Sequence, residues 1–506
     1  MTQLTDPTEV SPINPEMAAD ITKFEEMLAD YQAGRVPEDV FRVFRLNNGI
    51  YGQRQGGTNQ MVRVKVPYGA MTAGQLDLLA DVVDEHSRGW GHITTRQNIQ
   101  FHFVELAEIP TVMRKLAEVG LTTREACGDT VRNVQGCHLA GACPLEILDV
   151  TPWAEAAYRH FVRNPLAQRL PRKFKIGIAV PPCNDVDLFS QDVGFVAHVE
   201  DGEVAGYSIH VGGGFGMSHG KLETYPCLAK PLFYCAAENA AAACEAVVTV
   251  QRDHGDRSDR KHARMKYLIA ERGIDWFRGK IEDRISFPTE PVRAVQLDTV
   301  ADTLGWHAQG DGKYFVGVYV AQGRIADNET SRPRSAFRRI AGEIGCSMRV
   351  TANANMYFYD ISEEDRSRVD AILAEHGLVT GENFTAMRQM GHACVALPTC
   401  GLALSESERV FTGLLDSVDV ILEELGLRDD PILVRMTGCP NGCARPYNAD
   451  FAFVGRAPGK YAMFVGGSSA GDRLAGLEKK MGLCASETAS LVFSECRVPR
   501  ENLLRP

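Results

Sequence analysis

Four cysteines in the second half of the chain stand in two close pairs. Cys394 and Cys400 lie in HACVALPTCG, and Cys439 and Cys443 lie in TGCPNGCARP. Four thiolates in two close pairs suit a tetrahedral all-sulfur site, which in proteins means zinc or an iron–sulfur cluster. The five-residue spacer of the first pair is wide for structural zinc, whereas a cubane presents corners that lie further apart. The spacing favours a 4Fe–4S cluster over zinc or over unliganded buried thiols.

The first half of the chain carries an incomplete version of the same pattern. Cys137 and Cys143 repeat the five-residue spacing, but only Cys183 follows where the second half has its CPNGC turn. Three thiols do not complete a cubane, so we interpret them as remnants of a duplication that pack as small apolar side chains. The same interpretation covers four scattered cysteines, which are Cys227, Cys235, Cys244 and Cys346.

Basic side chains alternate with apolar ones in two predicted strands. Arg63 and Lys65 alternate with valines in VRVKVP, and Lys173 and Lys175 alternate with Phe and Ile in LPRKFKI. Period-two placement sends each basic pair to one face of its strand, opposite a buried apolar face. A solvated face is the simplest explanation of such a pair. Arg132 adds a cation close to Cys137, however, and cations that converge beside a metal centre would form an oxyanion pocket.

Two further segments carry binding potential. The glycine run VGGGFGMSHG at 211–220 lets backbone approach a flat ligand, but it does not satisfy G-x-G-x-x-G and gives no support to a Rossmann nucleotide site. The basic run at 251–267 is a solvated helical face, a grip for a polycarboxylate cofactor or a dock for an acidic electron donor. Its basic residues are Arg252, Arg257, Arg260, Lys261, Arg264 and Lys266.

An internal repeat must position these residues. The stretch ITTRQNIQFHF from Ile93 aligns with VTANANMYFYD from Val350, an offset of 257 residues (350 − 93). Both stretches alternate with period two, which is typical of a half-buried strand. The same offset carries the first Cys-x5-Cys pair onto the second. We infer two related halves with a ligand bound between them, and the alternative is a coincidental register of two unrelated strands.

Each half mixes strands and helices in the same order. The segment 62–67 is predicted as a strand and 72–86 as a helix, with leucines and valines at helical spacing. In the second half, Ser362 and Asp365 have capping-box spacing at the start of a helix that Gly377 would end. These patterns predict an α+β protein.

Length and composition limit the class of protein. The 506 residues include 65 acidic and 54 basic side chains, for a net charge of −11, which excludes a general polyanion binder. No apolar run approaches the ~20 residues of a membrane span, and the first 40 residues lack a signal pattern, so we expect a cytoplasmic protein. There the 14 cysteines are expected as thiols or ligands rather than disulfides. The proline-rich segment 1–37 is predicted to be an extended arm.

The order of these motifs resembles a known family. VRVKVP, TTRQNIQFH, VRNV, LPRKFKI, VGGG, VQRDHGDRSDRKHA, ACVALPTC, MTGCPNGCARP and VGRAPGKYAMFVGG follow one another between about residues 40 and 480. This order is similar to that of the sirohaem and 4Fe–4S sulfite/nitrite reductase family, in its sulfite reductase haemoprotein (beta) subunit branch. The double-cysteine signature is the most specific part of the resemblance.

The resemblance implies roles for individual residues. Cys394, Cys400, Cys439 and Cys443 would hold the 4Fe–4S cluster, with Cys443 also bridging to the sirohaem iron. The substrate anion would be surrounded by Arg63, Arg132, Lys173 and Lys175. The residues implied as grips for the sirohaem are Arg96, Gly212, Gly213, Gly214, Arg257, Arg260, Lys261 and Arg264.

The implied reaction is the six-electron reduction of sulfite to sulfide, in which cations stabilise the anion and help to relay protons. The alternative is reduction of nitrite to ammonia. Nitrite-reducing relatives usually have Asn at the position of Lys175, so we favour sulfite. Electrons would come from a separate ferredoxin or NADPH flavoprotein. A different activity on the same fold would be that of an oxygenase of cobalamin synthesis, and outside enzymes the chain could be a zinc-binding structural protein.

The resemblance also implies an architecture with ferredoxin-like half-domains and two α/β domains that clasp the cofactors. A central pseudo-symmetric domain would comprise 38–118 plus 290–376, flanked by a sirohaem and substrate domain at 119–289 and a cluster domain at 377–506. The tail at about 483–506 is instead similar to part of an acyl-CoA dehydrogenase. Tyr51 and Cys127 are candidates for the Tyr–Cys link that some ferredoxin-dependent members carry.

Overall fold

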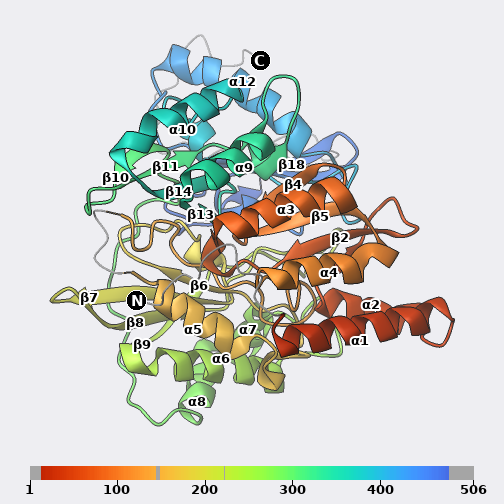
Figure 1. Cartoon of the computed structure of the whole chain (residues 1–506). Helices are drawn as coiled ribbons and strands as arrows, with labels where there is room; N and C mark the ends of the chain where they lie inside the picture. Colours follow the sequence, from red (N-terminus) through yellow and green to blue (C-terminus); the bar gives the residue numbers. More distant parts are fainter. Residues whose placement is uncertain (1–12, 144–148, 222, 478–506) are drawn as a thin grey trace, which may run out of the picture.

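The computed structural model describes residues 13–143, 149–221 and 223–477, arranged around four β-sheets (Figure 1). Among these residues, no helix combines the length and the apolar character needed to cross a membrane. The atypical C-terminal tail lies outside the described residues. The predicted domain boundaries stay a prediction. The four sheets form two pairs, and the two members of each pair have related topologies.

Two five-stranded sheets form the centre of the molecule and have the same internal order. The first runs β1 (Ile50–Gly52), β2 (Asn59–Val64), β5 (Asn98–Glu105), β4 (Trp90–Thr94) and β12 (Arg324–Ala326). The second runs β10 (Gly305–Ala308), β11 (Tyr314–Val318), β14 (Met356–Ile361), β13 (Ser347–Val350) and β3 (Ala70–Met71). The last strand of each sheet comes from the other half of the chain. This exchange confirms the duplication predicted from the repeat.

Helices cover the central sheets. They are α1 (Pro15–Gln32), α2 (Glu38–Asn47), α3 (Ala73–His86), α4 (Ile109–Glu118), α9 (Pro333–Ile344) and α10 (Glu363–Glu375). The predicted helix starts are confirmed, since Thr72 and Gln75 form a capping box before α3 and the Ser362 side chain accepts from the Asp365 amide before α10. The apolar faces of these helices and sheets form one core.

The extended arm predicted for residues 1–37 is wrong for the described part of that segment. Pro15 occupies the first turn of α1, where proline is tolerated, and the Asn14 side chain caps the helix. Ile21, Phe24 and Leu28 lie on one buried face of the helix. Pro15 therefore begins this helix rather than interrupts it.

The repeat stretches differ from the prediction in two ways. Each is a hairpin rather than one strand, because β4 ends at Thr94 and β5 begins at Asn98, while β13 and β14 flank the corresponding turn. The polar face of β5 is also buried, including Gln100 and His102. Period two fixes which side chains share a face, but it does not reveal that the flanking parts of the chain cover the polar face.

Two mixed sheets flank the centre and extend the duplication. One runs β6 (Ile176–Ala179), β7 (Val193–Glu200), β8 (Glu203–Val211) and β9 (Lys230–Ala236). The other runs β15 (His392–Ala393), β16 (Val434–Thr437), β17 (Phe451–Ala457), β18 (Lys460–Val465) and β19 (Gly476–Leu477). In both, a parallel pair (β6 with β7, β16 with β17) leads into an antiparallel hairpin. The starts of β6 and β16 are 258 residues apart (434 − 176).

The remaining α-helices pack around these two sheets. They are α5 (Thr151–Phe161), α6 (Ala240–His254), α7 (Met265–Arg272), α8 (Ile274–Glu282), α11 (Ala386–Met390) and α12 (Glu408–Leu425). The loops that follow β6 and β16 point toward the central sheets, and they carry the chemistry described next.

Candidate functional site

The four predicted cluster cysteines share one neighbourhood. Cys394 follows β15, Cys400 lies in the loop after it, and Cys439 and Cys443 lie in the turn after β16. Burial, and next the charge of Cys443, raise the pKa of Cys394 to about 12. The pKa of Cys439 is raised by burial, then by Cys443, and to a smaller extent by the other two thiols. Thiols that oppose one another's ionisation in this way are relieved by a shared metal centre.

Four thiols in one neighbourhood match the donor set of a 4Fe–4S cluster. Among the described residues, no three His, Cys, Asp or Glu side chains come close enough to hold one metal ion. A 4Fe–4S cubane accepts thiolates from four separate corners. Cys439 is buried, Cys394 and Cys400 are half-buried, and Cys443 is exposed. The predicted bridging role of Cys443 stays a prediction.

The first half of the chain holds the cluster loops in place. Arg54 donates from Nε to the carbonyl oxygen of Cys400 at 3.1 Å, and Gln55 donates to that of Pro398 at 2.8 Å. The Thr95 hydroxyl, in the turn between β4 and β5, donates to the carbonyl oxygen of Cys443 at 2.9 Å. Both cysteine loops are thus tied to the sheet that carries Arg63.

The two predicted lysines precede β6 and face a group of cations. Lys173 and Lys175 are half-buried between buried apolar neighbours, as their alternation predicted. Burial, and then Arg96 and Arg264, lower the pKa of Lys175 to about 7. Burial, and then Arg172 and Lys175, lower the pKa of Lys173 well below its usual value. Among the described carboxylates, none forms an ion pair with either ammonium group.

Arg132 and Arg63 complete the predicted group. The Arg132 guanidinium donates to the carbonyl oxygens of Ala126 at 3.1 Å and Gly128 at 2.7 Å. Burial lowers the pKa of Arg132 to about 10, and Arg63 adds to this effect. Arg63 donates to Gln100 at 2.7 Å, while its buried Nε has no partner among the described residues. The structure brings all four predicted cations together.

This group carries more positive than negative charge. Asp192 is its main buried carboxylate, and it accepts from Arg264 at 2.9 Å and from the backbone amide of Lys175 at 2.9 Å. The cations neighbour the cysteine site, because Thr95 donates to the carbonyl oxygen of Cys443 at 2.9 Å and the adjacent Arg96 donates to that of Ile176, beside Lys175, at 3.1 Å. Buried cations without matching carboxylates favour a polyanionic ligand, which a cofactor with carboxylate side chains and an anionic substrate supply.

The glycine run is shaped by close protein contacts. Gly212 has a positive φ of 86°, and a side chain at Gly213 would meet the Gln191 carbonyl oxygen at 2.2 Å. A side chain at Gly214 would meet the Arg264 guanidinium at 2.6 Å. Lys266 fixes the run by donating to the Gly214 carbonyl oxygen at 3.0 Å. The glycines therefore allow close packing inside the protein, and their contact with a cofactor stays a prediction.

Arg96 is buried and already engaged by protein groups. Its guanidinium donates to the side chains of Gln135 and Gln191 and, at 3.1 Å, to the carbonyl oxygen of Ile176. Burial lowers the pKa of Arg96 to about 9. Its Nε has no partner among the described residues, which leaves one donor available for a carboxylate.

The remaining predicted cofactor grips lie at the surface. Arg257 donates to the backbone carbonyl of Arg169 at 3.0 Å, and Arg260 pairs with Asp129 at 3.0 Å. Lys261 is exposed. Only Arg264 of these predicted grips from the basic run is buried beside the lysines. The role of the first three as cofactor grips stays a prediction.

Two site residues were missed by reading the sequence, and a third, Lys266, was expected only as a member of the basic run. Arg172 lies beside Lys173, Asp192 joins the lysine strand to Arg264, and Lys266 holds the glycine run. A signal for Asp192 exists in the duplication, because Asp450 stands 258 residues later (450 − 192). The other two look like ordinary members of basic stretches.

Tyr51 and Cys127 lie near each other. Burial raises the pKa of Tyr51, and the charges of Cys400 and then Cys127 raise it further. Cys127 is buried, with its thiol 3.8 Å from the Gly49 carbonyl oxygen. A Tyr–Cys link between them stays a prediction, and intact mass with peptide mapping would detect it.

The lysines predict a pH-dependent stability for the cofactor-free protein. Their pKa values are lowered on folding, so between about pH 7 and pH 9 the unfolded chain binds more protons than the folded one. The free energy of unfolding therefore gains from rising pH. Replacing both lysines (Lys173→Met with Lys175→Met) is expected to reduce this gain, as measured by Tm at pH 7 and pH 9. An equal change in the wild type and the variant would contradict the prediction.

Comparisons with known proteins identify the family of this chain. Residues 127–289 match the nitrite and sulphite reductase 4Fe-4S domain, and residues 51–119 and 307–376 match the nitrite/sulfite reductase ferredoxin-like half domain. The sulfite reductase [NADPH] hemoprotein beta-component of Oceanobacillus iheyensis is 38% identical over 83% of this chain and 77% of its own length. The protein of that name from Paenibacillus sp. (strain JDR-2) is 40% identical over 83% and 78%.

A solved structure has the same fold. The NirA protein of Mycobacterium tuberculosis superposes with a TM-score of 0.79 at 27% sequence identity, covering 94% of this chain and 91% of that one. The duplicated α+β fold predicted from the sequence is therefore confirmed.

Proposed function

Because this chain belongs to the nitrite and sulfite reductase family, we propose that it is the haemoprotein component of a sulfite reductase. The reaction is the six-electron reduction of sulfite to sulfide. Its cofactors are sirohaem and a 4Fe–4S cluster, which would carry electrons from the donor protein to the bound substrate.

One observation carries this proposal. The cysteine site and the cation group meet at the turn between β4 and β5. There the Thr95 hydroxyl donates to the carbonyl oxygen of Cys443 at 2.9 Å, and the next residue, Arg96, donates to the carbonyl oxygen of Ile176, beside Lys175, at 3.1 Å. Cys394, Cys400, Cys439 and Cys443 would hold the cluster. An oxyanion bound among the cations would therefore lie beside the exposed cysteine, where electrons are delivered.

The cations have two tasks in this scheme. Arg63 and Arg132 offer guanidinium N–H groups held in fixed directions, which suits binding of paired oxygens. Lys173 and Lys175 contribute charge and protons. An anion bound between them raises their pKa, so both are protonated while sulfite is bound and can donate as S–O bonds break.

The electron donor is a separate protein. The names of the relatives contain NADPH, which favours a flavoprotein component over a ferredoxin. Sulfite is the preferred substrate over nitrite because Lys175 adds a charge that a dianion uses more fully than a monoanion. A cytoplasmic location is part of the same proposal.

The experiment is an optical and EPR spectrum of the purified protein, followed by turnover with a non-physiological reductant. We expect sirohaem absorption, a cluster signal on reduction, and a higher kcat/KM for sulfite than for nitrite. A colourless protein with one zinc per chain would contradict the proposal. A higher kcat/KM for nitrite would replace the substrate but leave the family unchanged.

A further inference from the structure

Two loops occupy equivalent places in the two halves of the chain. Asp187 follows β6 and Arg445 follows β16, and they stand 258 residues apart (445 − 187). Both have a left-handed backbone, with φ of 52° and 56°, and each directly precedes a short 3-10 turn, Leu188–Ser190 or Pro446–Asn448. The loops are therefore structural counterparts.

Their hydrogen bonds are equivalent as well. The Asp192 carboxylate accepts from the backbone amide of Lys175 at 2.9 Å, and the Asp450 carboxylate accepts from that of Leu433 at 2.9 Å. Both pairs keep the offset of 258 residues. The duplication thus preserves the backbone framework, while the side chains at equivalent positions have diverged.

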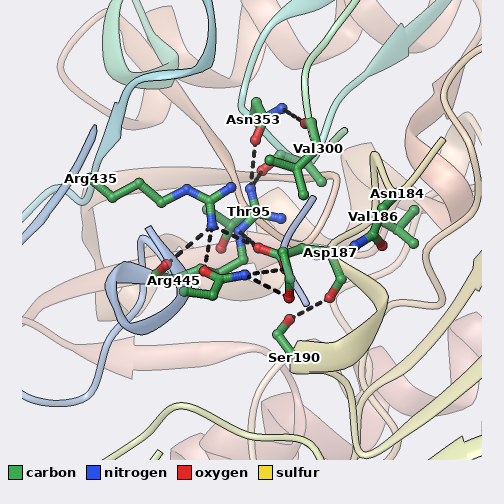
Figure 2. Close-up of polar contacts among 12 residues, drawn as sticks. Thr95, Asn184, Val186, Asp187, Ser190, Val300, Asn353, Arg435 and Arg445 are labelled. Atoms are coloured by element: carbon green, nitrogen blue, oxygen red, sulfur yellow. Dashed lines mark hydrogen bonds and ion pairs between the residues drawn. The ribbon is translucent and has the colours of Figure 1, made fainter. Parts of the chain in front are cut away.

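At Asp187 and Arg445 this divergence produces a pair of opposite charges. The Asp187 carboxylate lies 3.4 Å from Nε of Arg445 and accepts from Nη1 of Arg435 at 2.7 Å and from Asn448 at 2.7 Å. Figure 2 shows the two arginines converging on Asp187. All of these side chains are buried, and a buried charge held by such partners is costly to leave alone.

The arginine side of the pair belongs to the cluster segment. Arg445 is the second residue after Cys443, and its carbonyl oxygen accepts from Arg435 at 3.1 Å. Its Nη2 donates to the Ala352 carbonyl oxygen at 2.8 Å and to the Asn353 side chain at 2.7 Å, in the turn between β13 and β14. Asp187 is thus one of a few groups that locate this segment.

The aspartate side belongs to the loop that carries the anion site. The carbonyl oxygen of Asp187 accepts from the Gln191 side chain at 3.3 Å. The next residue, Asp192, holds both the Lys175 backbone and the Arg264 guanidinium. One loop, residues 184–192, therefore touches the cluster segment at Asp187 and the anion-binding cations at Asp192.

We propose that Asp187 is a positioning residue that fixes the Cys443 segment relative to Lys175 by pairing with Arg445 across the two halves. The proposal rests on the proposed function for its catalytic consequence. Its structural part is independent of any cofactor. It predicts that the pair keeps residues 439–446 in one place in the cofactor-free protein too.

The test uses Asp187→Asn, which keeps the shape of the side chain and removes its charge. In the cofactor-free full chain, we expect amide hydrogen exchange of residues 439–446 to rise at least about tenfold, because the opening of this segment loses a buried ion pair. In the loaded enzyme, we expect a weakened exchange coupling between sirohaem and cluster by EPR. With a non-physiological reductant, kcat should fall by about 10²-fold, the size expected from a ~1 Å misplacement.

A second variant separates positioning from folding. Asp187→Asn with Arg435→Met leaves one buried arginine instead of two, so stability should partly recover while the contact with Arg445 stays absent. We expect Tm to rise toward the wild-type value and the exchange of residues 439–446 to stay fast. Wild-type exchange in either variant overturns the proposal, as does recovery of exchange together with Tm in the double variant.

A matched control removes a different ion pair. Asp419→Asn breaks the 2.6 Å pair between Asp419 on α12 and Arg388 on α11, which touches neither loop. Exchange of residues 439–446 should stay unchanged in this variant. A wild-type protein without sirohaem or sulfite turnover would remove the proposed function, whereas the exchange result would still decide the role of Asp187.

Discussion

Replacing Cys443 with serine is expected to abolish sulfite turnover and to remove the cluster and its coupling to sirohaem together. Cys443 is the one exposed thiol of the four, and its carbonyl oxygen accepts from Thr95, the residue before Arg96. A hydroxyl is a poor substitute for a thiolate at iron. Because changing a group behind a metal ligand already costs ~10–100-fold, loss of the ligand itself should lower kcat by more than about 10³-fold.

The measurement is iron and sirohaem content per chain, with EPR of the reduced protein. The control is Cys346→Ser, at a buried cysteine just before β13 in the central sheets. It should keep both cofactors and near-normal turnover, since burial explains its raised pKa of about 12 without a metal partner. A Cys443→Ser protein with a full, coupled cluster would remove Cys443 from the ligand set.

Local patterns were enough to select the candidate cluster cysteines of this chain. The spacing of Cys394, Cys400, Cys439 and Cys443 requires no knowledge of the fold, and the structure brings these thiols together. The alternation around Lys173 predicted which side chains share a face, but it left a solvated face as the simplest explanation of the lysines. Both patterns span only a few residues, so they can be recognised without knowledge of the tertiary structure.

Contacts between distant segments could not be predicted in this way. In the sequence, Asp187 looks like an ordinary loop residue. Its contact with Arg445 becomes apparent only in the folded structure, where the two halves of the chain meet. Arg96 was expected as a cofactor grip, yet its environment of Gln135 and Gln191 depends on how three segments pack. The helix α1 was missed because its prolines were counted without regard to the first-turn position that Pro15 occupies.

Replacing Lys175 with leucine is expected to lower kcat/KM for sulfite by about 10²–10³-fold, the range found for loss of one group that stabilises a developing charge. The duplication indicates that this substitution should not disturb the fold. Leu433 occupies the equivalent position, with the same carboxylate–amide hydrogen bond and full burial. Leucine is therefore compatible with the backbone at position 175, and the substitution should remove the positive charge while the fold is kept.

Comparing sulfite with nitrite as substrates distinguishes a role of Lys175 in substrate selection from a role in folding or cofactor binding. A dianion loses about twice the attraction to one missing cation that a monoanion loses, so kcat/KM for sulfite should fall further than that for nitrite. Lys175→Asn, which retains polarity, should shift the preference in the same direction. The control is Lys313→Leu, at an exposed lysine between β10 and β11, which should change kcat/KM for neither anion. Equal losses for the two anions would show that Lys175 supports folding or cofactor binding and does not select the substrate.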